Sequence, residues 1–188
     1  MKLVIIDYGA GNTQSVKFAF QRLGVNPVLS SNEEDILSAD KVIFPGVGHA
    51  KAAMDVLKEK QLDRLIPQLK QPVLGICLGM QLMCKFSEEG KTPCLGIFDE
   101  TVKLFEPKAK VPHMGWQQTT DSQQQTTGFY YFVHSYYVPV NNYTTLTCQY
   151  ITDFSAAVQK DNFYGVQFHP EKSGEAGEQL LQKFLEAR

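Results

Sequence analysis

A cysteine flanked by two glycines is the candidate nucleophile of this chain. Cys77 follows the apolar run 72–76 within Gly-Ile-Cys-Leu-Gly, and a helix-like stretch begins directly after it. This spacing is that of the nucleophile elbow, a tight strand-to-helix turn, with sulfur in place of a serine oxygen. Glycine flanks such a turn because it has no Cβ that would clash. The N-terminus of a helix favours a thiolate, so the pattern predicts a cysteine-nucleophile enzyme with its thiol exposed at a strand end.

A base for this thiol and a group to orient the base stand together at 167–171, in Gln-Phe-His-Pro-Glu. An apolar strand is predicted to end at His169, and a carboxylate follows two residues later. Pro170 restricts the local backbone, which suits a Cys77–His169–Glu171 triad in which Glu171 holds the imidazole tautomer. Taken alone, His169 would be a structural histidine and Cys77 a buried thiol in a turn; the two motifs together favour the triad.

Two further glycine-containing loops follow predicted strands. Pro45-Gly46-Val47-Gly48 could supply backbone N–H groups to an oxyanion hole, with the N–H of Leu78 as the other donor. The alternative for this segment is an ordinary loop. Gly9-Ala10-Gly11 lacks the spacing of either nucleotide fingerprint, so no nucleotide is expected there.

Alternating strands and helices in the N-terminal half would position these loops. Strands are predicted at 3–6, 26–29, 41–44 and 72–76, and helices at 13–23, after 31, and at 49–60. Ser31 and Glu34 form a predicted capping box. This rhythm predicts a parallel sheet with helices on both faces, and such sheets gather their loops and ligands at the carboxyl ends of the strands.

The C-terminal half has a different pattern, rich in aromatic and β-branched residues. It predicts strands within 129–138, 145–150 and 156–167, with a hairpin turn at 161–162, and a closing helix from Ser173. The polar stretch Gln117–Thr127 is predicted to be an exposed loop. We therefore expect a single α/β domain over 1–188: a mostly parallel open sheet with helices on both faces and an antiparallel extension in the C-terminal half.

Composition narrows the class of protein. The 188 residues carry a net charge of -2 and are 43% hydrophobic, which gives no reason to expect nucleic acid or an anionic membrane as partner. No apolar run reaches the roughly 20 residues that span a bilayer. The run from Met1 to Ile6 favours a strand over a signal peptide, so we expect a cytoplasmic protein. The four cysteines show no CxxC pair and no zinc spacing, and neither a metal nor a cofactor is expected.

Together these motifs resemble the class I, triad-type glutamine amidotransferases. The resemblance rests on Gly-Ile-Cys-Leu-Gly-Met-Gln at 75–81 and on the 167–171 segment. Further segments narrow it to the glutaminase subunits of imidazole glycerol phosphate synthase, in histidine biosynthesis; they are 7–12, 45–48, 87–90, 112–116, 133–137 and 171–173. The resemblance covers nearly the whole chain. The chain departs from the family pattern at His49-Ala50 and at Gln117, away from the triad.

The resemblance implies L-glutamine as substrate, with Cys77 attacking the side-chain amide, His169 protonating the departing ammonia, and a glutamyl thioester as intermediate. It also implies an oxyanion hole at Gly46, Val47 and Leu78. The implied substrate-binding residues are Gly48, Gln81, Glu89, Ser135 and Tyr136, with the carboxylate of Glu89 facing the α-ammonium. Without the motifs, Gln81 would be placed on an exposed helix face and Glu89 would be a solvated charge.

The resemblance further implies a partner, a cyclase subunit with a (β/α)8 barrel that receives the ammonia. The implied partner face comprises Asn12, His113, Met114, Trp116 and Lys172. Trp116 is the only tryptophan; the alternative to a position on the partner face is a buried position in the core. Three rival functions stay open: a glutaminase subunit of anthranilate or pyridoxal phosphate synthase, a cysteine hydrolase of γ-glutamyl peptides, and a catalytically silent binding subunit.

Overall fold

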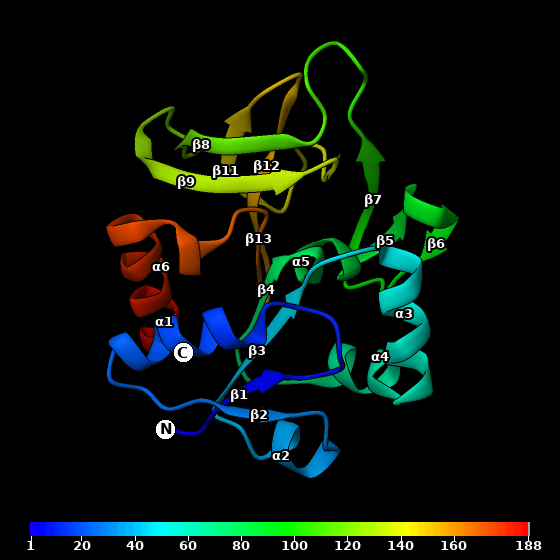
Figure 1. The fold of residues 1–188 in the computed structure, drawn as a ribbon, viewed down its shortest axis with the longest axis vertical. Helices are drawn as coiled ribbons and strands as arrows, with labels where there is room; N and C mark the ends of the chain where they lie inside the picture. Colours follow the sequence, from blue (N-terminus) through cyan, green and yellow to red (C-terminus); the bar gives the residue numbers. More distant parts are fainter. Residues whose placement is uncertain (188) are drawn as a thin grey trace.

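A nine-stranded mixed sheet runs through the molecule in the order β2-β1-β3-β4-β13-β12-β11-β8-β9 (Figure 1). The computed structural model describes residues 1–187, so Arg188 of the predicted domain lies outside the described residues. The first five strands of this order are parallel: β2 (Val28–Ser30), β1 (Leu3–Ile6), β3 (Lys41–Gly46), β4 (Val73–Cys77) and β13 (Phe163–Val166). The next four continue it with antiparallel pairing: β12 (Asp153–Lys160), β11 (Thr144–Gln149), β8 (His113–Thr120) and β9 (Thr126–His134). The predicted antiparallel extension is therefore confirmed.

A second, four-stranded sheet lies beside the first, in the order β10-β7-β5-β6. Its strands are β10 (Tyr136–Tyr137), β7 (Phe98–Leu104), β5 (Cys84–Ser87) and β6 (Thr92–Pro93). The predicted strand at 129–138 is thus split, because β9 ends at His134 and β10 pairs with β7 instead. At Ser135 the chain therefore passes from the first sheet to the second.

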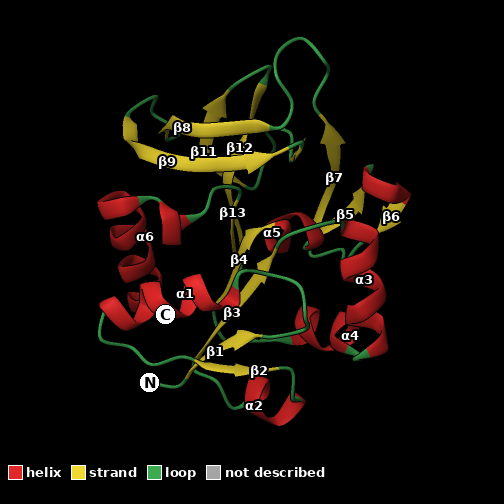
Figure 2. Cartoon of the chain, in the orientation of Figure 1, coloured by secondary structure: helices red, strands yellow, loops and turns green. Residues whose placement is uncertain are grey.

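Helices cover both faces of the parallel strands (Figure 2). They are α1 (Thr13–Arg22), α2 (Glu33–Leu37), α3 (Ala50–Glu59), α4 (Leu62–Leu65), α5 (Leu78–Leu82) and α6 (Gly174–Glu186), with short 3-10 turns η1 (Ile66–Gln68), η2 (Glu89–Lys91) and η3 (Pro170–Lys172). Side chains along β1 alternate between two apolar cores. Val4 and Ile6 pack on the side of α3, whereas Leu3 and Ile5 pack on the side of α1 and α6.

Two local predictions are wrong. Gln117–Thr127 is mostly a β-hairpin, because β8 runs to Thr120 and β9 starts at Thr126, with only 121–125 between them. Its polar side chains pair across the strands: the hydroxyls of Thr119 and Thr127 lie 2.7 Å apart. The cap of α2 is Asn32 and not Ser31, since the Asn32 side chain accepts from the N–H groups of Glu34 and Asp35.

The fold as a whole confirms the predicted α/β class. Within residues 1–187, none of the helices combines the length and apolarity that crossing a bilayer requires.

Candidate active site

The elbow forms where β4 ends at Cys77 and α5 begins at Leu78. Cys77 has φ 54° and ψ -112°, a strained conformation that L-residues adopt mainly at functional turns. Gly75 lies two residues earlier, where a Cβ would come within 2.9 Å of the Met80 backbone nitrogen. The turn therefore requires the glycine because the helix folds straight back over the strand.

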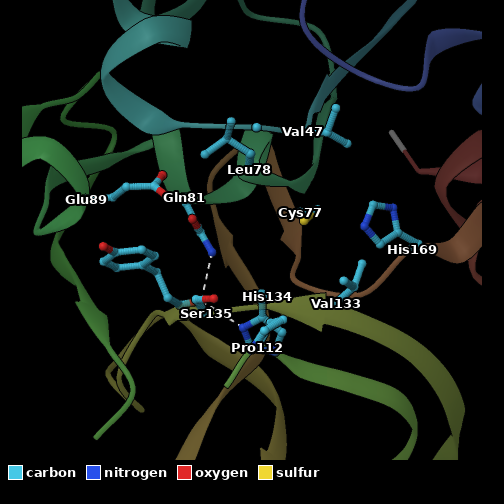
Figure 3. A pocket seen from close by; sticks show the side chains of 12 residues that line it. Val47, Cys77, Leu78, Gln81, Glu89, Pro112, Val133, His134, Ser135 and His169 are labelled. Carbon is cyan, nitrogen blue, oxygen red and sulfur yellow. Dashed lines mark hydrogen bonds between the residues drawn. The ribbon is translucent and has the colours of Figure 1, made fainter. Parts of the chain in front are cut away.

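Cys77 opens onto a cavity of about 310 Å³ and is 7% exposed (Figure 3). The thiol is thus more enclosed than the sequence predicted. The cavity is lined by Val47, Gly48, Cys77, Leu78, Gln81, Glu89, Pro112, Val133, His134, Ser135, Tyr136 and His169. It brings together two predicted triad members and all five predicted substrate-binding residues. Pro112, Val133 and His134 also line the cavity and were not predicted to do so; they lie in the segments 112–116 and 133–137, whose resemblance to the family was the available signal.

His169 and Glu171 form a buried pair beside this cavity. Nδ1 of His169 lies 2.8 Å from Oε1 of Glu171, and the two side chains are 4% and 1% exposed. Because a carboxylate only accepts, Nδ1 donates the hydrogen bond and Nε2 is left for the thiol. The backbone at His169 is held as well: its N–H donates to the carbonyl of Tyr131, and its carbonyl accepts from the hydroxyl of Ser173.

This environment favours a charged imidazole. Burial by itself lowers the pKa of His169, but its interactions with Cys77 and Glu171 outweigh burial and raise the pKa to about 10. Oε2 of Glu171 is, within residues 1–187, the one buried side-chain oxygen without a hydrogen-bond partner. The hydrogen bond to His169 through Oε1 is therefore the interaction that holds the Glu171 carboxylate in this buried position.

The two predicted substrate contacts on α5 and η2 differ in their surroundings. Gln81 is 4% exposed, which excludes the solvated helix face, and its Nε2 donates to the carbonyl of Tyr136 at 2.9 Å and to Oε1 of Gln167 at 2.8 Å. Glu89 is partly exposed and uses Oε2 to accept from the N–H of Ala50 at 2.7 Å. Since Ala50 is the first residue of α3, the helix N-terminus fixes this carboxylate at the cavity rim.

The candidate oxyanion segment lies along the other side of the elbow. Gly46 stands directly opposite Cys77 in the parallel pairing of β3 and β4. Val47 and Leu78 line the cavity, whereas Gly46 packs behind them, against the start of α5. The first N–H groups of α5 have no acceptor within the helix. The preceding residue, Pro45, is anchored because its carbonyl accepts from the buried hydroxyl of Tyr8 at 3.1 Å.

The predicted partner face is only partly a surface. Side chains along β8 alternate, so Met114 and Trp116 point outward at 57% and 54% exposure, whereas His113 is 3% exposed and points inward. The placement of His113 on this face is therefore corrected. Trp116 contacts Tyr131 edge-on, and the ammonium of exposed Lys172 lies 6.0 Å from the Tyr131 ring. The last member, Asn12, caps α1 through the N–H of Ser15.

His113 instead belongs to a buried histidine pair. Its Nδ1 lies 3.0 Å from Nε2 of His134, and Nδ1 of His134 lies 2.7 Å from the carbonyl of Tyr136. Burial lowers the pKa of His113 to about 4 and that of His134 to about 3. Among the described residues, no group of three or more His, Cys, Asp and Glu side chains could hold a metal ion.

Comparisons with known proteins agree with one another. Residues 4–187 match the family model for class I glutamine amidotransferases. The HisH subunit of imidazole glycerol phosphate synthase from Bacteroides fragilis (strain YCH46) is 56% identical, over 99% of this chain and 100% of the relative. The HisH subunit of Escherichia coli (strain K12) is 49% identical, again over 99% of this chain and 100% of the relative.

A crystal structure of a glutamine amidotransferase superposes with a TM-score of 0.78 at 16% identity, covering 97% of both chains. At this identity, the likeness supports the fold alone. The full-length sequence relatives and the family model carry the assignment further. The chain belongs to the class I glutamine amidotransferase family, and within it to the HisH subunits of imidazole glycerol phosphate synthase.

Proposed function

We propose that this chain hydrolyses L-glutamine to glutamate and ammonia through a Cys77–His169–Glu171 triad. The single observation that carries the proposal is the buried His169–Glu171 pair, with Nδ1 and Oε1 2.8 Å apart, beside the cavity that Cys77 lines. Interactions with Cys77 and Glu171 raise the pKa of His169 to about 10, which makes this imidazole a strong enough base to take the thiol proton. Transfer of this proton to His169 generates the thiolate nucleophile.

The reaction follows from these positions. The Cys77 thiolate attacks the side-chain amide carbon of glutamine, and the oxyanion is held by the N–H groups of Leu78 and of the Gly46–Val47 segment. His169 gives its proton to the departing nitrogen, and the C–N bond breaks to leave a glutamyl thioester and ammonia. His169 then takes a proton from water, the hydroxide attacks the thioester, and glutamate leaves as the Cys77 thiolate is restored.

The proposed substrate pocket contacts both ends of glutamine, the α-ammonium group and the side-chain amide. The carboxylate of Glu89 faces the α-ammonium, and Gln81 lies between Glu89 and Cys77 (Figure 3). Backbone groups of Gly48, Ser135 and Tyr136 complete the pocket, since all three residues line the same cavity. A γ-glutamyl peptide hydrolase would share the thiol but would have no use for a partner face.

The ammonia is proposed to pass to a cyclase subunit with a (β/α)8 barrel, in a one-to-one complex in the cytoplasm. Free ammonia would be mostly protonated at neutral pH and would lose its nucleophilicity, which favours direct transfer. The surface cluster in which Trp116 and Lys172 both contact the ring of Tyr131 is the proposed centre of the interface, because tryptophan is enriched at interface hot spots.

The test measures glutamate release by the chain alone, with the cyclase, and with the cyclase plus a ligand of its barrel. We expect slow turnover alone, stimulation by the liganded cyclase, and loss of turnover in Cys77→Ala. A glutamine-mimicking diazo-ketone should label Cys77 in the stimulated complex. The proposal is rejected if the liganded complex neither hydrolyses glutamine nor forms this adduct. Mixing the chain with anthranilate or pyridoxal phosphate synthase partners tests the rival assemblies.

A further inference from the structure

Gln167 is a fully buried carboxamide beside the candidate nucleophile. It lies one residue beyond the end of β13, where Val166 pairs with Ile76 of the parallel neighbour β4. The register therefore sets Gln167 alongside Cys77. Because side chains alternate along an extended segment, Gln167 and His169 emerge on one side and Phe168 on the other. The strand end thus presents two polar side chains to the thiol, Gln167 and His169. The proposed glutaminase reaction uses only His169.

The orientation of the Gln167 carboxamide follows from a neighbouring backbone carbonyl. The carbonyl oxygen of Tyr136 can only accept, so Gln81 must present its NH₂ group there, at 2.9 Å. The same NH₂ group lies 2.8 Å from the Gln167 carboxamide, which must therefore present its oxygen. The NH₂ group of Gln167 is then left facing Cys77, with Nε2 3.8 Å from Sγ.

The buried histidine pair holds the reference carbonyl in place. Nδ1 of His134 must donate to the carbonyl of Tyr136, so Nε2 of His134 accepts from Nδ1 of His113. Burial lowers the pKa of both rings, to about 4 and about 3, so both stay neutral near pH 7 and keep these tautomers. All donor directions between His113 and Cys77 are consequently determined.

We propose that Gln167 is a catalytic residue that donates a hydrogen bond to the Cys77 thiolate. The role rests on the proposed glutaminase function and adds to it. The thiol proton still moves to His169, and Gln167 exchanges no proton. Its N–H stabilises the charge on sulfur before attack, and again when the thioester breaks down and sulfur leaves as a thiolate. A hydrogen bond to an ionised group is worth more than one between neutral groups.

The test compares Gln167→Met with a matched control, Gln71→Met. Methionine keeps the length of the side chain and removes the donor. Gln71 is partly buried and donates to the carbonyl of Ile36 near the opposite end of β4, so its replacement also removes a side-chain hydrogen bond, but far from Cys77. The readout is the rate of Cys77 alkylation by iodoacetamide between pH 5 and 10, followed by peptide mass spectrometry. Burial raises the pKa of the Cys84 thiol, and it raises the pKa values of Cys94 and Cys148 to about 12. These three thiols therefore react slowly.

We expect Gln167→Met to move the midpoint of the Cys77 alkylation profile upward by about one pH unit, a tenfold change in the thiolate equilibrium. In the cyclase complex its kcat for glutamine should fall with KM little changed. Gln71→Met should leave the midpoint where it is. A folded Gln167→Met variant with an unmoved midpoint would overturn the role of Gln167.

If Gln167→Met does not fold, Gln167→Asn carries the same test. The shorter amide stays polar beside Gln81 but withdraws its nitrogen from sulfur, so the midpoint should again rise, and an unmoved midpoint again overturns the role. Alkylation does not involve glutamine. A Gln167 variant with an unmoved midpoint and normal glutamine turnover therefore rejects only the role of Gln167 as a donor. A complex of the wild-type chain with the cyclase that does not hydrolyse glutamine rejects the proposed function itself.

Discussion

The backbone of Gly79 lies against the carbonyl oxygen of Phe44: a Cβ built on Gly79 would stand 1.9 Å from that oxygen. The contact joins the first turn of α5 to β3, the strand that leads into the candidate oxyanion segment. No side-chain rotation can relieve it, because the obstructing atom belongs to the backbone. The elbow and the oxyanion segment are therefore held together at one point where only glycine fits.

Gly79→Ala should consequently displace α5 from β3. We expect the free energy of unfolding to fall by about 3 kcal/mol, the upper end of the range for overpacking, and glutamine turnover to be lost. Urea denaturation and the glutaminase assay measure the two effects. Gly24→Ala is the control: Gly24 has φ +79° with no atom near the added Cβ, so it should cost about 1 kcal/mol and leave turnover intact. Equal turnover in both variants would contradict the prediction.

Glu171→Gln should keep a hydrogen bond to His169 and remove its charge. The pKa of His169 should then fall from about 10, and glutamine hydrolysis should drop by about 100-fold or more. Because this pKa is raised above the unfolded value, the stability it contributes is fully present below about pH 6.5 and is lost as the pH rises through about 10. NMR titration of the imidazole and unfolding curves at several pH values check both statements.

Glu178→Gln is the control for Glu171→Gln. Glu178 pairs with Arg22 at 2.9 Å, but both side chains are well exposed, at 40% and 53%. Surface pairs of this kind contribute less than about 1 kcal/mol, and turnover should be unchanged. A similar loss of activity in Glu178→Gln and Glu171→Gln would contradict a specific role for the buried pair.

The neutral histidine pair should make the fold sensitive to acid. The unfolded chain binds protons on His113 and His134 below about pH 6.5. In the folded chain His113 stays unprotonated down to about pH 4 and His134 down to about pH 3, because burial lowers both pKa values. Stability should therefore fall on acidification by about 1.4 kcal/mol per pH unit for each histidine. His169, whose raised pKa lies far above this range, keeps its proton throughout. His113→Asn should remove about half of this slope in urea unfolding measured from pH 6.5 to 4.5; an unchanged slope would contradict the neutral pair.

Trp116→Ala should weaken the complex with the cyclase without unfolding the chain. The indole is 54% exposed, so its removal leaves little cavity, and we expect the melting temperature to stay within a few degrees. Affinity for the cyclase should drop by about tenfold or more, as for interface hot spots. Calorimetric titration measures it. Leu37→Ala removes a comparably exposed side chain on α2, 53% exposed, and should not alter binding.

Much of this architecture is readable from the sequence because it depends on local patterns. Apolar runs separated by helical periodicity predict the parallel strands, and Gly-x-Cys-x-Gly predicts the sharp turn at Cys77 whatever surrounds it. The hairpin of β8 and β9 was missed for the opposite reason. Its glutamines and threonines are typical of loops, and they form strands because each strand pairs with the other across Thr119 and Thr127.

The sequence by itself determined which groups could do chemistry: a thiol on a tight turn, and an imidazole with a carboxylate two residues beyond it. Only the tertiary structure decided which of them meet. Pairing of β4 with β13 sets Gln167 beside Cys77 and brings His169 to the same cavity, and the alternation along β8 turns His113 inward while Trp116 faces solvent. Strand register and facing depend on partners far away in the chain, and no local pattern contains that information.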